Sequence, residues 1–99
     1  HIQFFAGELM AEMLDGTFRY HVAKDYDIDI IVTKRKRPVF IGEVKWTKKL
    51  KKSDISKFLK NTEKFNCRKA FISRSFFDTN DIEIITPTKL LEMIGSHHL

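Results

Sequence analysis

Two segments rich in β-branched residues constrain the fold of this chain most strongly. Residues 26–32 read Tyr-Asp-Ile-Asp-Ile-Ile-Val, and residues 39–46 read Val-Phe-Ile-Gly-Glu-Val-Lys-Trp. Their composition, and the polar residues that recur at every second position, predict two β-strands over residues 26–33 and 39–46. The intervening Lys-Arg-Lys-Arg-Pro at residues 34–38 is a short connection. A connection of this length predicts that the two strands form an antiparallel hairpin.

The rest of the chain predicts a small α/β domain of mixed α+β type. Helices are expected over residues 4–14, after a cap at Ser53 or Asp54, and over residues 89–94. Further strands are expected over residues 18–22, 70–77 and 82–85. Gly16 suits a left-handed cap after the first helix, and Gly95 is expected to stop the last one. The predicted order is α-β-β-β-α-β-β-α, with a central mixed sheet flanked by helices.

Length and composition indicate one globular domain over residues 1–99. Hydrophobic residues make up 42% of the chain and charged residues 31%, as in a soluble protein. No apolar run approaches the ~20 residues needed to cross a bilayer, so no membrane association is expected. The lone Cys67 can form neither an internal disulfide nor a cysteine-based zinc site, which favours an intracellular, cytoplasmic setting. Because the chain starts at His1 without an initiator Met, it is expected to be part of a longer one.

The net charge of +5 conceals a strong asymmetry along the chain. Residues 34–69 contain 14 Lys or Arg against three acidic residues, whereas the remaining residues carry a net negative charge. Such a partition indicates a basic surface for a polyanionic partner. The alternative is that these lysines only solubilise exposed faces, and net charge alone does not decide between the two.

Asp29, Glu43 and Lys45 are the candidate catalytic residues. Side chains two positions apart on a strand share a face, so Glu43 and Lys45 point the same way, and Asp29 lies beside them if the strands pair. Two carboxylates, with the carbonyl of Val44, suit a Mg²⁺ ion, and Lys45 is placed to orient a water or stabilise a transition state. A surface salt-bridge ladder worth ~0.2–1 kcal/mol per pair is the alternative. The apolar strands around these charges favour the metal site, because buried charges are costly unless they are paired or coordinate an ion.

This pattern resembles the PD-(D/E)xK nuclease superfamily, whose restriction endonuclease-like fold also contains archaeal Holliday junction resolvases. Asp29 matches the first acid of the motif and Glu43-Val44-Lys45 the second part, after an interval of 14 positions. Trp46 and the Asp-Ile-Asp-Ile-Ile-Val strand are most similar to nuclease-like domains at the C-terminus of archaeal AAA-type ATPases. The resemblance implies a DNA endonuclease, restriction-like or junction-resolving, that uses Mg²⁺ or Mn²⁺ and leaves a 5′-phosphate. It also implies a homodimer, or an ATPase domain in the same longer chain.

Two positions depart from the pattern of the family. Asp27 stands where the family often has Pro or Glu, and it is either an extra ligand or an edge charge; we assign it a supporting role. The family also places a Glu on the helix before the hairpin. Both Glu8 and Glu12 are available here, and Glu8 fits the position better, although either is equally suited to be a solvated helix charge.

The candidate DNA-binding residues directly follow the catalytic strand, where they would contact phosphates without reading sequence. They are Lys48, Lys49, Lys51, Lys52, Lys57 and Lys60. The main alternative to a nuclease is a non-catalytic DNA-binding or protein-docking module attached to an ATPase. An RNA target is a weaker option, because no aromatic pair of the kind that stacks RNA bases is present.

Overall fold

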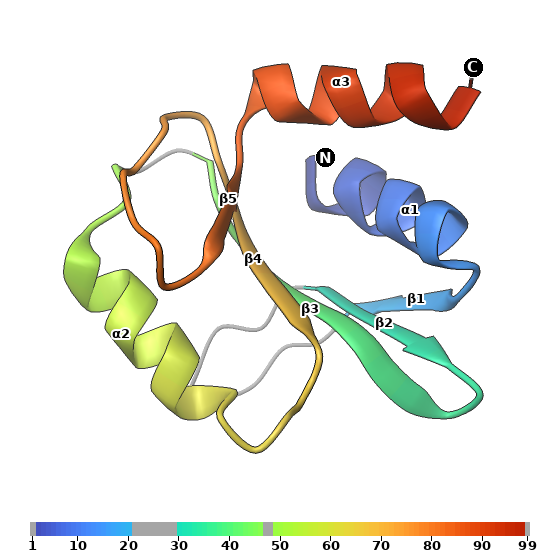
Figure 1. Ribbon diagram of the computed structural model, residues 1–99, viewed down its shortest axis with the longest axis horizontal. Coiled ribbons are helices and arrows are strands. Elements are labelled where there is room, and N and C mark those ends of the chain that lie inside the picture. The colour runs from blue at the N-terminus through green and yellow to red at the C-terminus, as the bar shows by residue number, and fades with distance from the viewer. Residues whose placement is uncertain (1, 21–29, 47–48, 99) are drawn as a thin grey trace.

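The computed structural model describes residues 2–20, 30–46 and 49–98 (Figure 1). In chain order, these residues form α1 (Ile2–Leu14), β1 (Thr17–Tyr20), β2 (Ile30–Lys34), β3 (Arg37–Lys45), α2 (Lys52–Asn61), β4 (Arg68–Ser73), β5 (Glu83–Ile85) and α3 (Pro87–His98). The predicted order of helices and strands is confirmed, and the domain is mixed α/β. Within the described residues, no helix combines the length and the apolar character that crossing a bilayer demands.

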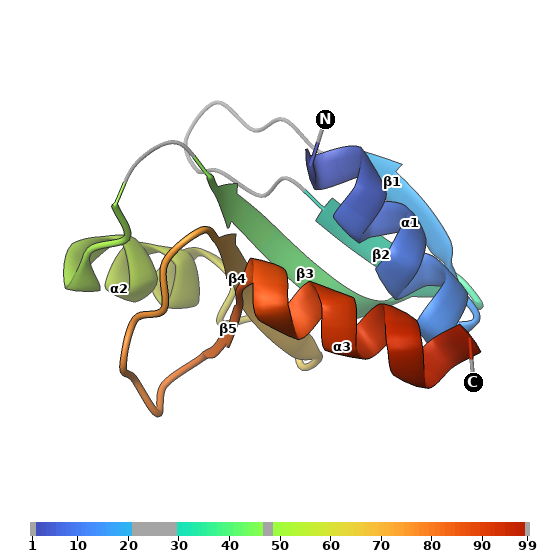
Figure 2. The same ribbon diagram turned by 90° about the horizontal axis from the view of Figure 1, so that it is seen from above.

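The five strands form one mixed sheet in the order β1-β2-β3-β4-β5. Strands β1, β2 and β3 are antiparallel neighbours, whereas β4 runs parallel to β3 and β5 runs parallel to β4. Helix α2 lies in the connection between β3 and β4, because parallel neighbours need a long crossover. Helices α1 and α3 cover one face of the sheet and α2 covers the other (Figures 1 and 2).

Each face of the sheet has its own hydrophobic core. The core beneath α1 and α3 includes Met10, Val32, Phe40 and Ile72, all of which are inaccessible to solvent. The residues of the second core, beneath α2, are Ile41, Leu50, Ile55, Phe58, Phe71 and Ile82. Alternate residues of β3 therefore serve different cores, as the two-residue period of a strand requires.

The turn between β2 and β3 is shorter than the sequence predicts. Pairing extends to Lys34 and Arg37, which leaves only Arg35 and Lys36 in the turn. Further up the hairpin, the partner of Val32 is Phe40, whereas the next residue of β2 pairs with Pro38. Val39, between Pro38 and Phe40, is therefore the extra residue of a β-bulge. A proline, which has no N–H, is tolerated beside such a bulge.

Helix α1 ends in a Schellman motif. The backbone N–H of Gly16 donates to the carbonyl of Ala11 at 2.8 Å, and that of Asp15 donates to Glu12 at 3.3 Å. The left-handed residue is Asp15, with φ of 54°, so the expectation that Gly16 has this conformation is wrong. Gly16 is required for space instead, since a Cβ there would lie 2.7 Å from the carbonyl oxygen of Thr33.

Two other helix ends differ from the prediction. Helix α2 begins at Lys52, with Lys51 as its N-cap, rather than being capped by Ser53 or Asp54. Helix α3 continues through Gly95 to His98, so Gly95 does not stop it. Gly95 lacks the positive φ that terminates a helix, and a Cβ at this position would meet nothing within 4 Å.

Gly7 allows α1 to approach the sheet closely. A Cβ at this position would overlap the aromatic ring of Phe18 on β1. We expect Gly7→Ala to lower the free energy of unfolding by about 1–2 kcal/mol, because overpacking outweighs the better helix propensity of alanine. Urea unfolding measures this change.

Gly95→Ala is the matched control, since it gains the same propensity without a clash. It should raise the free energy of unfolding by about 0.5–1 kcal/mol. An equal gain from both substitutions would show that α1 has room to move away from β1.

Candidate active site

The carboxyl ends of β3 and β4 lie together at one edge of the sheet, because these strands are parallel. In their register Glu43 pairs with Phe71 and Lys45 pairs with Ser73. Glu43 is only 8% exposed and Ser73 is buried, whereas Lys45 is half-buried. The chain thus places a buried carboxylate and a more accessible ammonium at the end of its central strand.

Glu43 and Lys45 share one face of the sheet, as the sequence predicts, and the structure shows that α2 covers this face. Ile41, two residues before Glu43, belongs to the core beneath α2, and so does Phe71, the register partner of Glu43. Residues at intervals of two on β3 point to the same side. The contact of Lys45 with α2 confirms this orientation.

Asp54 on α2 is a component of this site that sequence reasoning identified only as a helix cap. Its Oδ1 lies 3.5 Å from Nζ of Lys45, and both side chains are about one-fifth exposed, at 22% and 23%. The other oxygen, Oδ2, accepts the backbone N–H of Lys51 at 2.9 Å. The capping interaction therefore fixes the carboxylate that holds the Lys45 ammonium. The available signal was that Asp54 is the lone acid among the lysines of residues 45–62.

A cavity of about 420 Å³ adjoins this ion pair. The described residues that line it are Lys45, Lys49, Lys51 and Asp54. Three ammonium groups against one carboxylate create a positive potential that attracts anions such as a phosphodiester. Of the predicted DNA-binding lysines, Lys49 and Lys51 therefore lie at the site.

The other predicted DNA-binding residues that the structure describes are not in the lining of this cavity. Lys52, Lys57 and Lys60 are exposed on α2, which starts beside the cavity. Lys48 lies outside the described residues. A nucleic acid entering the cavity would thus meet further positive charge along α2.

The structure describes some, but not all, of the acidic residues that the sequence predicts as metal ligands. Asp27 and Asp29 lie outside the described residues, while Val44 is half-buried on β3 beside Glu43. Glu8 and Glu12 are exposed on α1, the helix that covers the opposite face from Glu43 and Lys45. Among residues 2–20, 30–46 and 49–98, no group of three or more His, Cys, Asp or Glu side chains is arranged to hold a metal ion. The assignments of Asp27, Asp29, Glu8 and Glu12 remain predictions.

Among the described residues, the titratable groups with a shifted pKa, Cys67 and Arg68, lie at the other end of β4. Arg68 donates to both carboxylate oxygens of Glu83 on β5, each at 2.8 Å, and this hydrogen bonding raises the pKa of Arg68. Burial raises the pKa of the Cys67 thiol, against a smaller lowering by Lys69. Arg68 therefore fastens β5 to the sheet, and Cys67 is held in its neutral thiol form.

Comparison of the chain with protein-family models, with curated proteins and with solved structures found no match. Function is therefore inferred from the residues and their arrangement. The described part of the site consists of a buried carboxylate, a positioned ammonium and a cationic cavity. Its chemistry suits the binding of a phosphate group next to a carboxylate.

Proposed function

We propose that this chain is a metal-dependent DNA endonuclease domain of the PD-(D/E)xK type. The observation that carries the proposal is the placement of Glu43 and Lys45 on one face at the end of the central strand, where Lys45 also lines the cationic cavity. The helix order and the mixed sheet, with α1 and α2 on opposite faces, support a restriction endonuclease-like core.

The oxygen donors available to the site fit Mg²⁺, with Mn²⁺ as a substitute. Glu43 offers a buried carboxylate, Val44 a backbone carbonyl, and Asp29 directly precedes Ile30, whose register partner is Gly42. Such hard oxygen ligands are those that Mg²⁺ prefers. A bound ion would supply charge neutralisation at the phosphate and a more acidic water.

The side chains of this chain account for the remaining steps. Lys49 and Lys51 bind the phosphodiester electrostatically at the mouth of the cavity, and the exposed lysines of α2 hold the flanking backbone. Lys45, steadied by Asp54, orients the attacking water or donates to the charge that develops on the phosphate. In-line hydrolysis then leaves a 5′-phosphate.

The test is cleavage of end-labelled DNA, offered as linear duplex, four-way junction and flap, with Mg²⁺, Mn²⁺ or EDTA. We expect metal-dependent cutting that Glu43→Gln, which keeps the shape and removes the charge, reduces at least 100-fold. Glu63→Gln, which removes an exposed acid beyond α2, is the matched control and should cut normally. Cutting that survives EDTA or Glu43→Gln would contradict the proposal.

A non-catalytic DNA-binding module is the second candidate. The observation that favours it is that the cationic cavity and the exposed lysines of α2 bind phosphates without any need for a metal. Salt-sensitive binding by a protein that cuts none of the three substrates would decide for this module.

A further inference from the structure

The turn at the far end of the β2–β3 hairpin has an unusual composition. Arg35 and Lys36 both have positive φ, of 55° and 67°, in a two-residue turn between paired Lys34 and Arg37. This is the pattern of a type I′ turn, for which Asn-Gly is strongly preferred. Left-handed backbone at residues other than glycine costs about 1–3 kcal/mol per residue. The turn therefore has two cations at positions where Asn and Gly would give a more stable fold.

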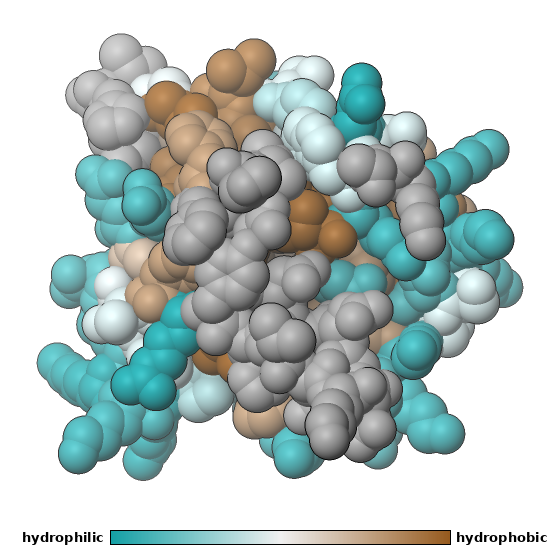
Figure 3. All heavy atoms as spheres, turned by 180° about the vertical axis from the view of Figure 1, so that it is seen from behind, coloured by the Kyte–Doolittle hydropathy of each residue, from teal (hydrophilic) through white to brown (hydrophobic). Residues whose placement is uncertain are grey.

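A group of five basic residues surrounds this turn, and we call it the hairpin surface. It comprises Arg19, Lys34, Arg35, Lys36 and Arg37. Two cavities, of about 710 and 620 Å³, lie against it, and together these cavities contact all five cations. Seen from behind, hydrophilic side chains project from this end of the molecule (Figure 3).

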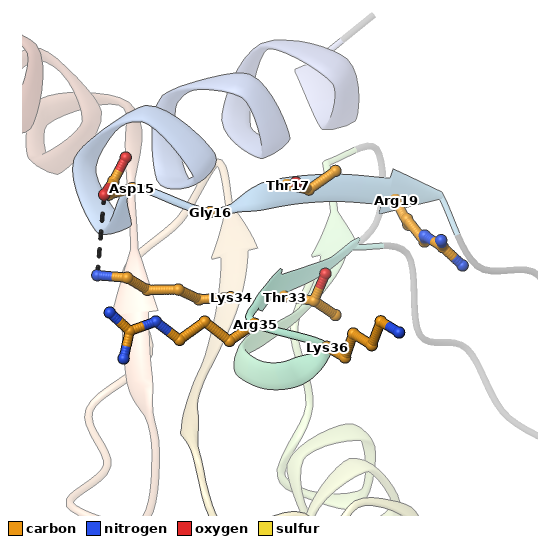
Figure 4. A pocket seen from close by; sticks show the side chains of 8 residues that line it. All are labelled: Asp15, Gly16, Thr17, Arg19, Thr33, Lys34, Arg35 and Lys36. Carbon is orange, nitrogen blue, oxygen red and sulfur yellow. Dashed lines mark ion pairs between the residues drawn. The ribbon is translucent and has the colours of Figure 1, made fainter.

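The cations of the hairpin surface point in different directions, so together they can contact more than one phosphate group. Lys34 and Arg35 reach toward the side of Asp15, while Lys36 reaches the other way, toward the side of Arg19 (Figure 4). Among the described residues, Asp15 is the lone acid that lines either cavity, and its contact with Lys34 is 3.9 Å long and highly exposed. An exposed pair of this kind contributes ~0–1 kcal/mol, so it leaves the positive potential largely intact.

The hairpin surface is separate from the candidate active site. Strand β3 carries the chain from Arg37 to Lys45, and at ~3.3 Å per residue this distance is about 26 Å. Duplex DNA rises 3.4 Å per base pair, so the same distance corresponds to about eight base pairs. This separation is too large for one phosphate contact and lies within the length of one duplex.

We propose that the hairpin surface is a second phosphate-backbone contact, which binds the flank of the duplex about eight base pairs from the cleavage site. The inference rests on the proposed nuclease function. Guanidinium groups suit such a contact because their fork of donors matches phosphate oxygens. Contact with the backbone adds affinity and orientation without sequence preference.

The test compares wild type with the double variant Arg35→Asn/Lys36→Gly, in binding to duplexes of about 6 and 24 base pairs without divalent metal, because the shorter duplex cannot reach both contacts. Asn-Gly suits the turn, so the variant should be more resistant to urea and any loss of binding cannot come from unfolding. We expect its affinity for the long duplex to fall roughly tenfold or more, and the salt dependence to lose about two units of slope. Affinity for the short duplex and its metal-dependent cleavage should stay within about threefold of wild type, since the site at Glu43 and Lys45 is untouched.

Lys64→Gln/Lys89→Gln is the matched control, because it removes two exposed lysines outside both basic surfaces. An equal loss in the control and in the hairpin variant would assign the effect to net charge and overturn the inference. Long-duplex affinity that is unchanged in the hairpin variant would also overturn it, and would favour an acidic protein as the partner of this surface. Absence of cleavage by wild type, with the length-dependent loss of binding still observed, would instead refute the nuclease function and leave the second contact in place.

Discussion

Lys45→Ala should reduce metal-dependent DNA cleavage by a factor of about 10²–10⁴, the usual contribution of a positioned proton donor or acceptor. Lys45 is the one cation that lies both at the end of β3 and in the cationic cavity within the described residues. Its loss removes the group that orients water or stabilises the transition state. DNA affinity should change by only about threefold, because Lys49 and Lys51 remain. Single-turnover cleavage at saturating DNA separates the two effects.

Two further variants test whether the loss is specific to Lys45 and whether Asp54 positions it. Lys52→Ala removes a lysine that is exposed at the start of α2, and its cleavage rate at saturation should equal that of wild type. Asp54→Asn keeps an oxygen for the backbone N–H of Lys51 but removes the charge that faces Lys45. If Asp54 positions Lys45, this variant should change the pH profile of cleavage and leave DNA affinity intact. Normal cleavage by Lys45→Ala would remove Lys45 from the mechanism.

Phe71→Ala should lower the free energy of unfolding by about 3–5 kcal/mol, a large fraction of the stability of a small domain. Phe71 is inaccessible to solvent, and its ring centroid lies 5.0 Å from that of Phe58 on α2. Truncation would leave a cavity between the sheet and the helix that presents Asp54 to Lys45. We therefore expect Phe71→Ala to lose cleavage activity at temperatures where wild type is still active.

Urea unfolding with Phe76→Ala as the control measures the effect. Phe76 is 70% exposed, so its truncation should change stability by less than about 0.5 kcal/mol. A loss of similar size in both variants would show that the burial of Phe71 against α2 does not account for the lower stability.

The shared face of Glu43 and Lys45 could be predicted because it depends only on the period of a strand. The alternation of residues 39–46 determines this geometry wherever the strand lies in the fold. In the same way, the short connection between the two strands was sufficient to predict the hairpin, which the pairing of β2 with β3 confirms.

The contact between Lys45 and Asp54 could not be predicted, because it depends on the position at which α2 begins over the sheet. A run of lysines with one acid is compatible with several starting residues, and Ser53 is an equally good capping residue by type. The left-handed residue after α1 was also missed. Asp and Gly both tolerate that conformation, and the choice between them depends on the close approach of Gly16 to β2.

The pairing of Arg68 with Glu83 has a consequence for association between copies of the chain. It joins β4 to β5, one of the two outer strands of the sheet, which is only three residues long and is followed by α3 at Pro87. An edge strand of three residues offers few free backbone groups with which another strand could pair. The charged side chains of Arg68 and Glu83 also lie at its start. A homodimer of this domain would therefore not form by continuing the sheet across β5.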